Sequence, residues 1–91
     1  MASRRNLKKD LNFITWELIS ECLVYQILHP EVPDEKIMQA IEEIAEKHNE
    51  LLALVNAPEN RHDRALAKKN YLAVRKGFLD MVQIINALSA S

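Results

Sequence analysis

The chain contains few residues that turn or break a helix: one glycine and three prolines among 91 residues. This scarcity is typical of long continuous elements and excludes a collagen-like structure. A composition of 48% hydrophobic and 27% charged residues excludes intrinsic disorder. At this length we expect a single domain, residues 1–91, with one continuous core.

Cysteine is equally scarce, because Cys22 is the only one in the sequence. A lone cysteine excludes an intramolecular disulfide framework and indicates a reducing compartment, so we expect a cytoplasmic location. No apolar run approaches the ~18 residues that a membrane span requires, and we expect no membrane-embedded segment. Glycine-rich phosphate loops and a nucleophile with a neighbouring histidine are also absent from the sequence.

Two proline-containing segments, residues 29–33 and 57–60, divide the chain into three parts with helical periodicity. Apolar residues recur in each part at alternating intervals of four and three residues, typical of helices that pack along their length. We predict helices over about residues 5–28, 33–57 and 62–89. Connections of about five residues make neighbouring helices antiparallel. The expected fold class is therefore all-α, an up-down-up antiparallel three-helix bundle.

The first and third predicted helices carry more apolar residues than one neighbouring helix would cover. The additional residues are Phe13, Ile19, Leu23, Val24 and Ile27 in the first helix and Leu72, Leu79 and Val82 in the third. We expect the third helix to be the most buried. We also predict that the bundle is completed by self-association, as a homodimer, through the first and third helices.

Three polar residues stand within the apolar rows: Glu21, His48 and Tyr71. Antiparallel pairing places His48 level with Tyr71, and we predict a hydrogen bond between the two side chains in a polar part of the core. Glu21 falls about seven residues from that level, and we predict partial exposure or a buried pairing with a base.

The formal net charge of −1 is the sum of unequal parts, since residues 31–59 carry −6 and residues 60–91 carry +4 with His neutral. The simplest interpretation is that packed helices present complementary faces. The basic residues also form a stripe that could bind an anion, consisting of Arg61, Arg64, Lys68 and Arg75. Nucleic-acid binding is disfavoured because no aromatic residues interleave with the stripe to stack bases.

Residues 42–46, Glu-Glu-Ile-Ala-Glu, resemble the Glu-Glu-x-x-Glu motif of the all-helical nucleoside triphosphate pyrophosphatases. The resemblance implies that carboxylates hold Mg²⁺ against phosphates. The residues it would involve are Glu42, Glu43, Glu46 and Asp80. The family's later Glu-x-x-Asp pair is incomplete here, because Gly77 stands in place of the glutamate. We therefore predict no catalytic residue, metal site or cofactor, and the pyrophosphatase remains an alternative.

Residues 4–10, Arg-Arg-Asn-Leu-Lys-Lys-Asp, precede a segment rich in leucine and isoleucine and resemble the start of short all-helical bacterial proteins. The resemblance implies a bacterial, cytoplasmic setting and assigns no activity. Taken together, these features favour a non-catalytic helical interaction or assembly module with an undefined protein partner over an enzyme. The anion or nucleic-acid binder is the second alternative.

Overall fold

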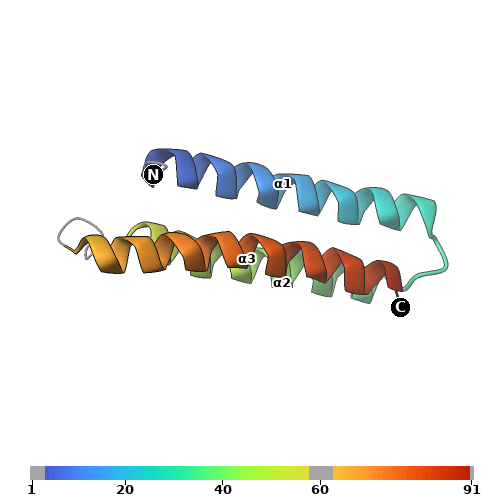
Figure 1. Cartoon of the computed structure of the whole chain (residues 1–91). Helices are drawn as coiled ribbons and strands as arrows, with labels where there is room; N and C mark the ends of the chain where they lie inside the picture. The colour runs from blue at the N-terminus through green and yellow to red at the C-terminus, as the bar shows by residue number, and fades with distance from the viewer. Residues whose placement is uncertain (1–3, 58–62, 91) are drawn as a thin grey trace.

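The computed structural model describes residues 4–57 and 63–90, and these ranges contain helices and no strand. Three helices follow one another: α1 (Arg4–Leu28), α2 (Asp34–Val55) and α3 (Arg64–Ala90). They run up, down and up along an elongated bundle (Figure 1) that measures 51 × 19 × 16 Å. The predicted all-α, antiparallel three-helix bundle is confirmed.

The turn between α1 and α2 is set by its second proline. Pro33 adopts φ −60° and ψ 138°, so α2 begins one residue later than predicted, at Asp34. Asp34 and Glu35 occupy the first turn of α2, where carboxylates complement the positive end of the helix dipole. The side-chain amide of Gln26 on α1 donates a hydrogen bond to Asp34 Oδ1 at 2.9 Å and links the two helices across the turn.

The far end of α2 lies two residues before the predicted boundary. The N–H of Asn56 donates to the carbonyl of Leu52 at 3.0 Å, and the N–H of Ala57 donates to the carbonyl of Leu54 at 3.3 Å. A residue that precedes proline is disfavoured in the helical region, and Ala57 precedes Pro58. The helix therefore closes with a turn at Val55–Ala57.

Helix α3 begins with a capping residue that the sequence analysis did not identify. Asp63 Oδ1 accepts hydrogen bonds from the backbone N–H groups of Ala65 at 3.0 Å and Leu66 at 3.1 Å. These N–H groups have no partner inside the helix, so the carboxylate satisfies two donors and complements the helix dipole. The predicted boundary at about residue 62 lies outside the described residues.

Replacing Asp63 with alanine is expected to lower the free energy of unfolding by ~1 kcal/mol, the usual effect of removing an N-cap. Urea denaturation at fixed protein concentration measures this. Asp63→Asn, which keeps an oxygen acceptor, should recover most of the lost stability. Equal losses in both variants would contradict the capping role.

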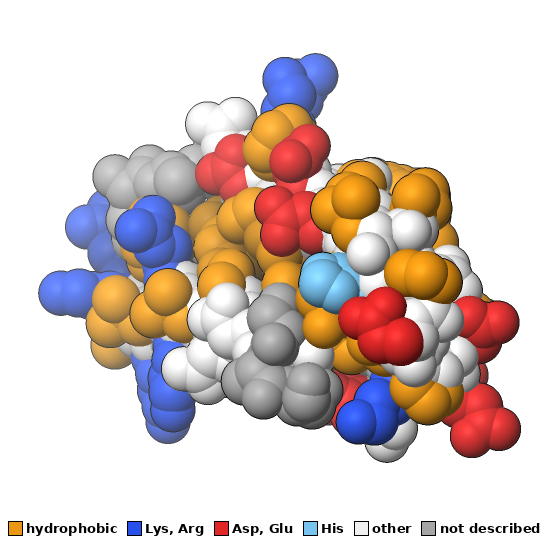
Figure 2. All heavy atoms as spheres, turned by 90° about the vertical axis from the view of Figure 1, so that its right-hand side faces the viewer, with side chains coloured by type: hydrophobic (Ala, Val, Ile, Leu, Met, Phe, Trp, Pro, Cys, Tyr) orange, Lys and Arg blue, Asp and Glu red, His pale blue; other side chains and the backbone are white. Residues whose placement is uncertain are grey.

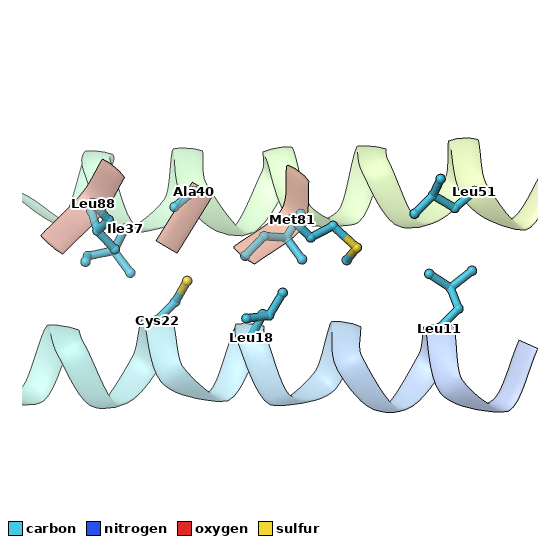
Figure 3. Packing of buried hydrophobic residues seen from close by; sticks show 9 residues of the cluster. Leu11, Leu18, Cys22, Ile37, Ala40, Leu51, Met81 and Leu88 are labelled. Atoms are coloured by element: carbon cyan, nitrogen blue, oxygen red, sulfur yellow. The ribbon is translucent and has the colours of Figure 1, made fainter. Parts of the chain in front are cut away.

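Side chains from all three helices meet along the axis of the bundle (Figure 3). Leu11, Leu18 and Cys22 extend from α1 toward α2, where Leu51 lies near the level of Leu11 and Ile37 near the level of Cys22. The largest fully buried side chains are those of Leu11, Ile37, Ile44, Met81, Val74 and Cys22. Thr15 is buried beside them, and its hydroxyl donates to the carbonyl of Leu11 at 2.7 Å, so its burial leaves no donor unsatisfied.

Helix α2 packs extensively against both other helices, whereas the contact between α1 and α3 is smaller. The expectation that the third helix is the most buried is wrong, because α3 leaves Leu72, Leu79 and Val82 exposed. The physical reason is that α2 makes an extensive contact with both of its neighbours, whereas α3 makes an extensive contact with α2 alone. Part of the second apolar row on α3 therefore faces water.

Gly77 is buried where α3 approaches α2. A Cβ atom at this position would lie 2.6 Å from Cδ1 of Leu51 and closer still to Cδ2. The absence of a side chain thus permits close contact between the two helices.

Candidate interaction surface

The largest group of exposed hydrophobic side chains belongs to α1. Phe13, Trp16, Leu23, Val24 and Ile27 are between 47% and 77% exposed. We call these five residues, together with the exposed Ser20, the outer face of α1. Monomeric proteins rarely present so many contiguous apolar side chains to water, so this face is the leading candidate for a binding surface.

The outer face exists because α1 carries two apolar rows on opposite sides. The inner row contains Leu7, Leu11, Leu18 and Cys22, all of them buried. The outer row follows positions 13, 16, 20, 24 and 27, which also repeat every three or four residues. At about 100° per residue, Ser20 lies on the opposite side of the helix from Leu11. Two opposed apolar rows are typical of a helix that is packed on both sides.

A groove of about 350 Å³ between α1 and α2 adjoins the outer face. Its lining consists of Asn12, Thr15, Trp16 and Ile19 from α1 and Ala45, His48 and Asn49 from α2. His48 Nε2 lies 2.8 Å from Oδ1 of Asn12, and His48 Nδ1 lies 3.3 Å from Oδ1 of Asn49. The indole of Trp16 therefore belongs both to the outer face and to a groove with polar groups.

The hydrogen bond predicted between His48 and Tyr71 does not form, and Glu21 lies apart from both residues, as its position along the helix predicted. His48 is half-buried and bonds to Asn12 instead of Tyr71, because its side of α2 faces α1. Tyr71 is half-buried and packs against a separate apolar cluster, formed by Leu7, Val55 and Val74. Glu21 is exposed, since it lies about 100° around the helix from buried Cys22. The predicted polar core is thus replaced by a partly exposed polar contact between α1 and α2.

Cys22 packs as a small hydrophobic residue. It is fully buried, and burial, followed by the nearby charge of Glu21, raises the pKa of its thiol. The thiol therefore stays protonated at neutral pH and makes a poor nucleophile.

The basic stripe predicted on the third helix is exposed over the part that the structure describes. Arg64, Lys68 and Arg75 are exposed and lie on one side of α3, at intervals of four and seven residues. Arg61 lies outside the described residues. Two exposed leucines, Leu72 and Leu79, lie near this row. This side of α3 is therefore partly apolar and partly basic.

The carboxylates that resemble a pyrophosphatase motif are not brought together with Asp80. Glu42, Glu43 and Glu46 are exposed on α2. Asp80 Oδ2 instead lies 3.6 Å from the ammonium group of Lys47. Within residues 4–57 and 63–90, no three or more His, Cys, Asp or Glu side chains are grouped to hold a metal ion.

The charges of the bundle are separated along its length. Basic side chains gather at the end where α1 and α3 begin: Arg5, Lys8, Lys9, Arg64, Lys68 and Lys69. Carboxylates predominate at the opposite end, around the turn from α1 to α2, where Glu31, Asp34 and Glu35 are exposed. Viewed from that end, carboxylates lie beside exposed hydrophobic side chains, and most of the visible basic side chains lie on the other side of the view (Figure 2).

Glu31 is held at the acidic end by two local interactions. A hydrogen bond from its own backbone N–H, and then its contact with His29, lower the pKa of the Glu31 carboxyl. His29 Nδ1 lies 3.1 Å from Glu31 Oε1, and the imidazole stacks on Tyr25 with 4.3 Å between the ring centres. The Glu31 carboxylate is consequently charged at neutral pH.

Comparison of the chain with protein-family models, curated proteins and solved structures finds no match. Over the residues that the structure describes, none of the helices combines the length and hydropathy needed to traverse a lipid bilayer.

Two residues of this surface were not predicted from the sequence. Trp16 was not assigned to an apolar row, and Asn12 was not recognised as a partner for His48. The first was detectable, because Trp16 completes a second three-and-four repeat with Phe13 and Ile27. The second was not, because residues 36 positions apart meet only through helix packing.

Proposed function

We propose that the protein is a non-catalytic helical assembly module that forms a homodimer through the outer face of α1. The observation that supports this function is the row of large hydrophobic side chains exposed along one side of one helix. Removing such surface from water is the main favourable contribution to most protein association. Glu17 lies at one edge of this row, four residues after Phe13, and the central positions Trp16, Ser20 and Ile27 are uncharged.

The outer face supplies a large part of the area that a stable dimer buries. Phe13 and Trp16 are 65% and 69% exposed. Burying an aromatic side chain removes ~150–250 Å² of surface from water. The still-exposed parts of the four aromatic side chains in two copies would together bury roughly 400–700 Å² on dimerisation. Leu23, Val24 and Ile27 extend this area toward the ~1,200–2,000 Å² that stable interfaces bury.

We assign the interface to α1 and not to α3, although both helices expose apolar residues. Leu72, Leu79 and Val82 on α3 lie near a row of exposed bases, which favours continued solvation of that side.

A cytoplasmic location also forms part of the proposal. Cys22 is buried and forms no disulfide, and a lone cysteine is typical of proteins from reducing compartments.

Sedimentation velocity at micromolar concentration tests the dimer. The wild-type protein should sediment as a dimer. The double variant Trp16→Gln and Ile27→Gln should weaken dimerisation by ~100-fold or more, because buried aromatic and aliphatic anchors dominate interface energies. Glutamine is a good helix former, so circular dichroism should show that α1 is retained.

The matched control is the double variant Met38→Gln and Leu79→Gln, whose residues are 54% and 65% exposed on α2 and α3. This variant should remain dimeric. A monomeric wild-type protein, or equal weakening in both double variants, would contradict the proposed interface.

The alternative functions give different signals: an anion binder would bind RNA or DNA in a salt-dependent manner, and a pyrophosphatase would be thermally stabilised by Mg²⁺ with nucleotides. Either signal would count against a purely structural module.

A further inference from the structure

The outer row of α1 is symmetric about its smallest member. Phe13 and Ile27 lie seven residues before and after Ser20, and Trp16 and Val24 lie four residues before and after it. A two-fold axis perpendicular to α1 at Ser20 would therefore superimpose positions of the row on other positions of the row. The symmetry favours an antiparallel pair. In a parallel pair each position lies level with the same position of the other copy, so no symmetry within the row would be required.

Resting on the proposed dimer, we infer that the second copy packs antiparallel to the first along α1, with Ser20 of both copies at the two-fold axis. Each aromatic residue then lies level with an aliphatic residue of the other copy: Phe13 with Ile27, and Trp16 with Val24. Large side chains alternate with smaller ones across the contact. The two serines allow the helix axes to approach closely where they cross.

The charges of the bundle favour the same orientation. In the antiparallel pair, residues 5–9 of one copy extend beyond Leu28 of the other and reach its turn between α1 and α2. The basic Lys9 thereby approaches the acidic end that carries Glu31 and Asp34, all of them exposed. A parallel pair would place Lys9 beside Lys9, and like charges across an interface oppose association.

The groove beside Trp16 fits this arrangement as well. Around α1, Leu23 and Ile27 lie on the same side of the outer row's centre line as Trp16 and Asn12. The two-fold axis keeps these residues on one side of the dimer. Leu23 of the second copy therefore lies close to the level of Trp16, at the edge of the groove that Trp16 shares with His48.

A single spin label distinguishes the two orientations. Asp10 is exposed beside the outer row and takes no part in it, so the Asp10→Cys variant leaves the contact intact. The native thiol is removed by Cys22→Ala, and circular dichroism checks that the fold is kept. Position 10 lies ten residues from Ser20, and a helix rises 1.5 Å per residue, so each label lies about 15 Å along the helix from the two-fold axis. In antiparallel copies the two labels lie on opposite sides of that axis and should be about 30 Å apart. Parallel copies would place them within ~20 Å.

Double electron–electron resonance on this variant measures the distance directly. A distance near 30 Å is expected. A shorter distance in a protein that still sediments as a dimer would overturn the antiparallel arrangement and leave the proposed function intact. A monomeric protein in sedimentation would overturn both.

Charge reversal supplies an independent readout. Lys9→Glu should weaken the dimer several-fold at low salt, and adding Glu31→Lys to the same chain should restore it, since the two positions meet across the antiparallel interface. The Lys69→Glu variant on α3 is the matched control and should not respond to Glu31→Lys. Failure of Glu31→Lys to restore dimerisation would also overturn the antiparallel arrangement.

Discussion

Replacing Ile44 with alanine is expected to lower the free energy of unfolding by ~2–5 kcal/mol. Ile44 is fully buried in the middle of α2, within the cluster that contains Leu18 and Met81. Because α2 packs against both neighbours, the cavity would open between all three helices and could not be filled by the movement of one side chain. Small domains have a total stability of ~5–15 kcal/mol, so much of it would be lost.

Urea denaturation followed by circular dichroism measures the effect of Ile44→Ala, at one protein concentration for all variants because dimerisation contributes to stability. Met38→Ala on the same helix is the matched control. Met38 is mostly exposed and should change stability by no more than ~0.5 kcal/mol. If the two variants lost the same stability, the placement of α2 at the centre of the core would be wrong.

Replacing Gly77 with valine is expected to destabilise the bundle by ~1–3 kcal/mol or more. Even a Cβ atom would lie 2.6 Å from Cδ1 of Leu51, and valine adds two further methyl groups. Leu51 is itself buried and has little room to move. The gain of ~1 kcal/mol in helix propensity on removing glycine offsets only part of this repulsion.

A double-mutant cycle isolates the contact between Gly77 and Leu51. Leu51→Ala alone should also destabilise, because it leaves a cavity. In the variant that carries Gly77→Val and Leu51→Ala together, the valine methyl groups can occupy the space left by the leucine. The loss should therefore be smaller than the sum of the single losses by ~0.5–3 kcal/mol. Additive losses would show that the two positions are not in contact.

The placement of α1 connects the fold with the proposed function. Its inner row contributes Leu11, Leu18 and Cys22 to the core, and its outer row presents Trp16 and Ile27 to water. One helix can thus stabilise the bundle and bind a second copy with separate residues. Substitutions on the outer row should for this reason reduce association without unfolding the domain.

Much of the fold was predictable from the sequence. The two proline-containing segments place the ends of the helices, and the three-and-four repeats of Leu11 and Leu18 on α1 and of Ile37, Ile44 and Leu51 on α2 identify the core. The errors at both ends of α2 came from local chemistry: the extended backbone at Pro33 delays its start, and Ala57, which precedes Pro58, favours an early end. The cap of α3 by Asp63 is also the effect of a single side chain. Such details depend on one or two residues and not on a repeated pattern.

The candidate surface was predictable only in part. The excess of apolar residues on the first and third helices indicated that some of them would remain exposed, and Phe13, Leu23 and Leu79 are. The sequence analysis separated these additional residues from the main apolar repeats, but it did not assign Trp16 to either set. It also paired His48 with the wrong neighbour, because the level of a residue along a bundle does not specify the direction of its side chain.

The sequence by itself determined the number, extent and alternating direction of the helices, since these follow from periodicity, proline positions and short connections. Only the tertiary structure decided that α2 lies between its neighbours, that His48 meets Asn12, and that Trp16 faces outward. The reason is geometric. A repeat marks an apolar row on a helix, but the rotation of that helix about its own axis is set by simultaneous packing against the other two helices.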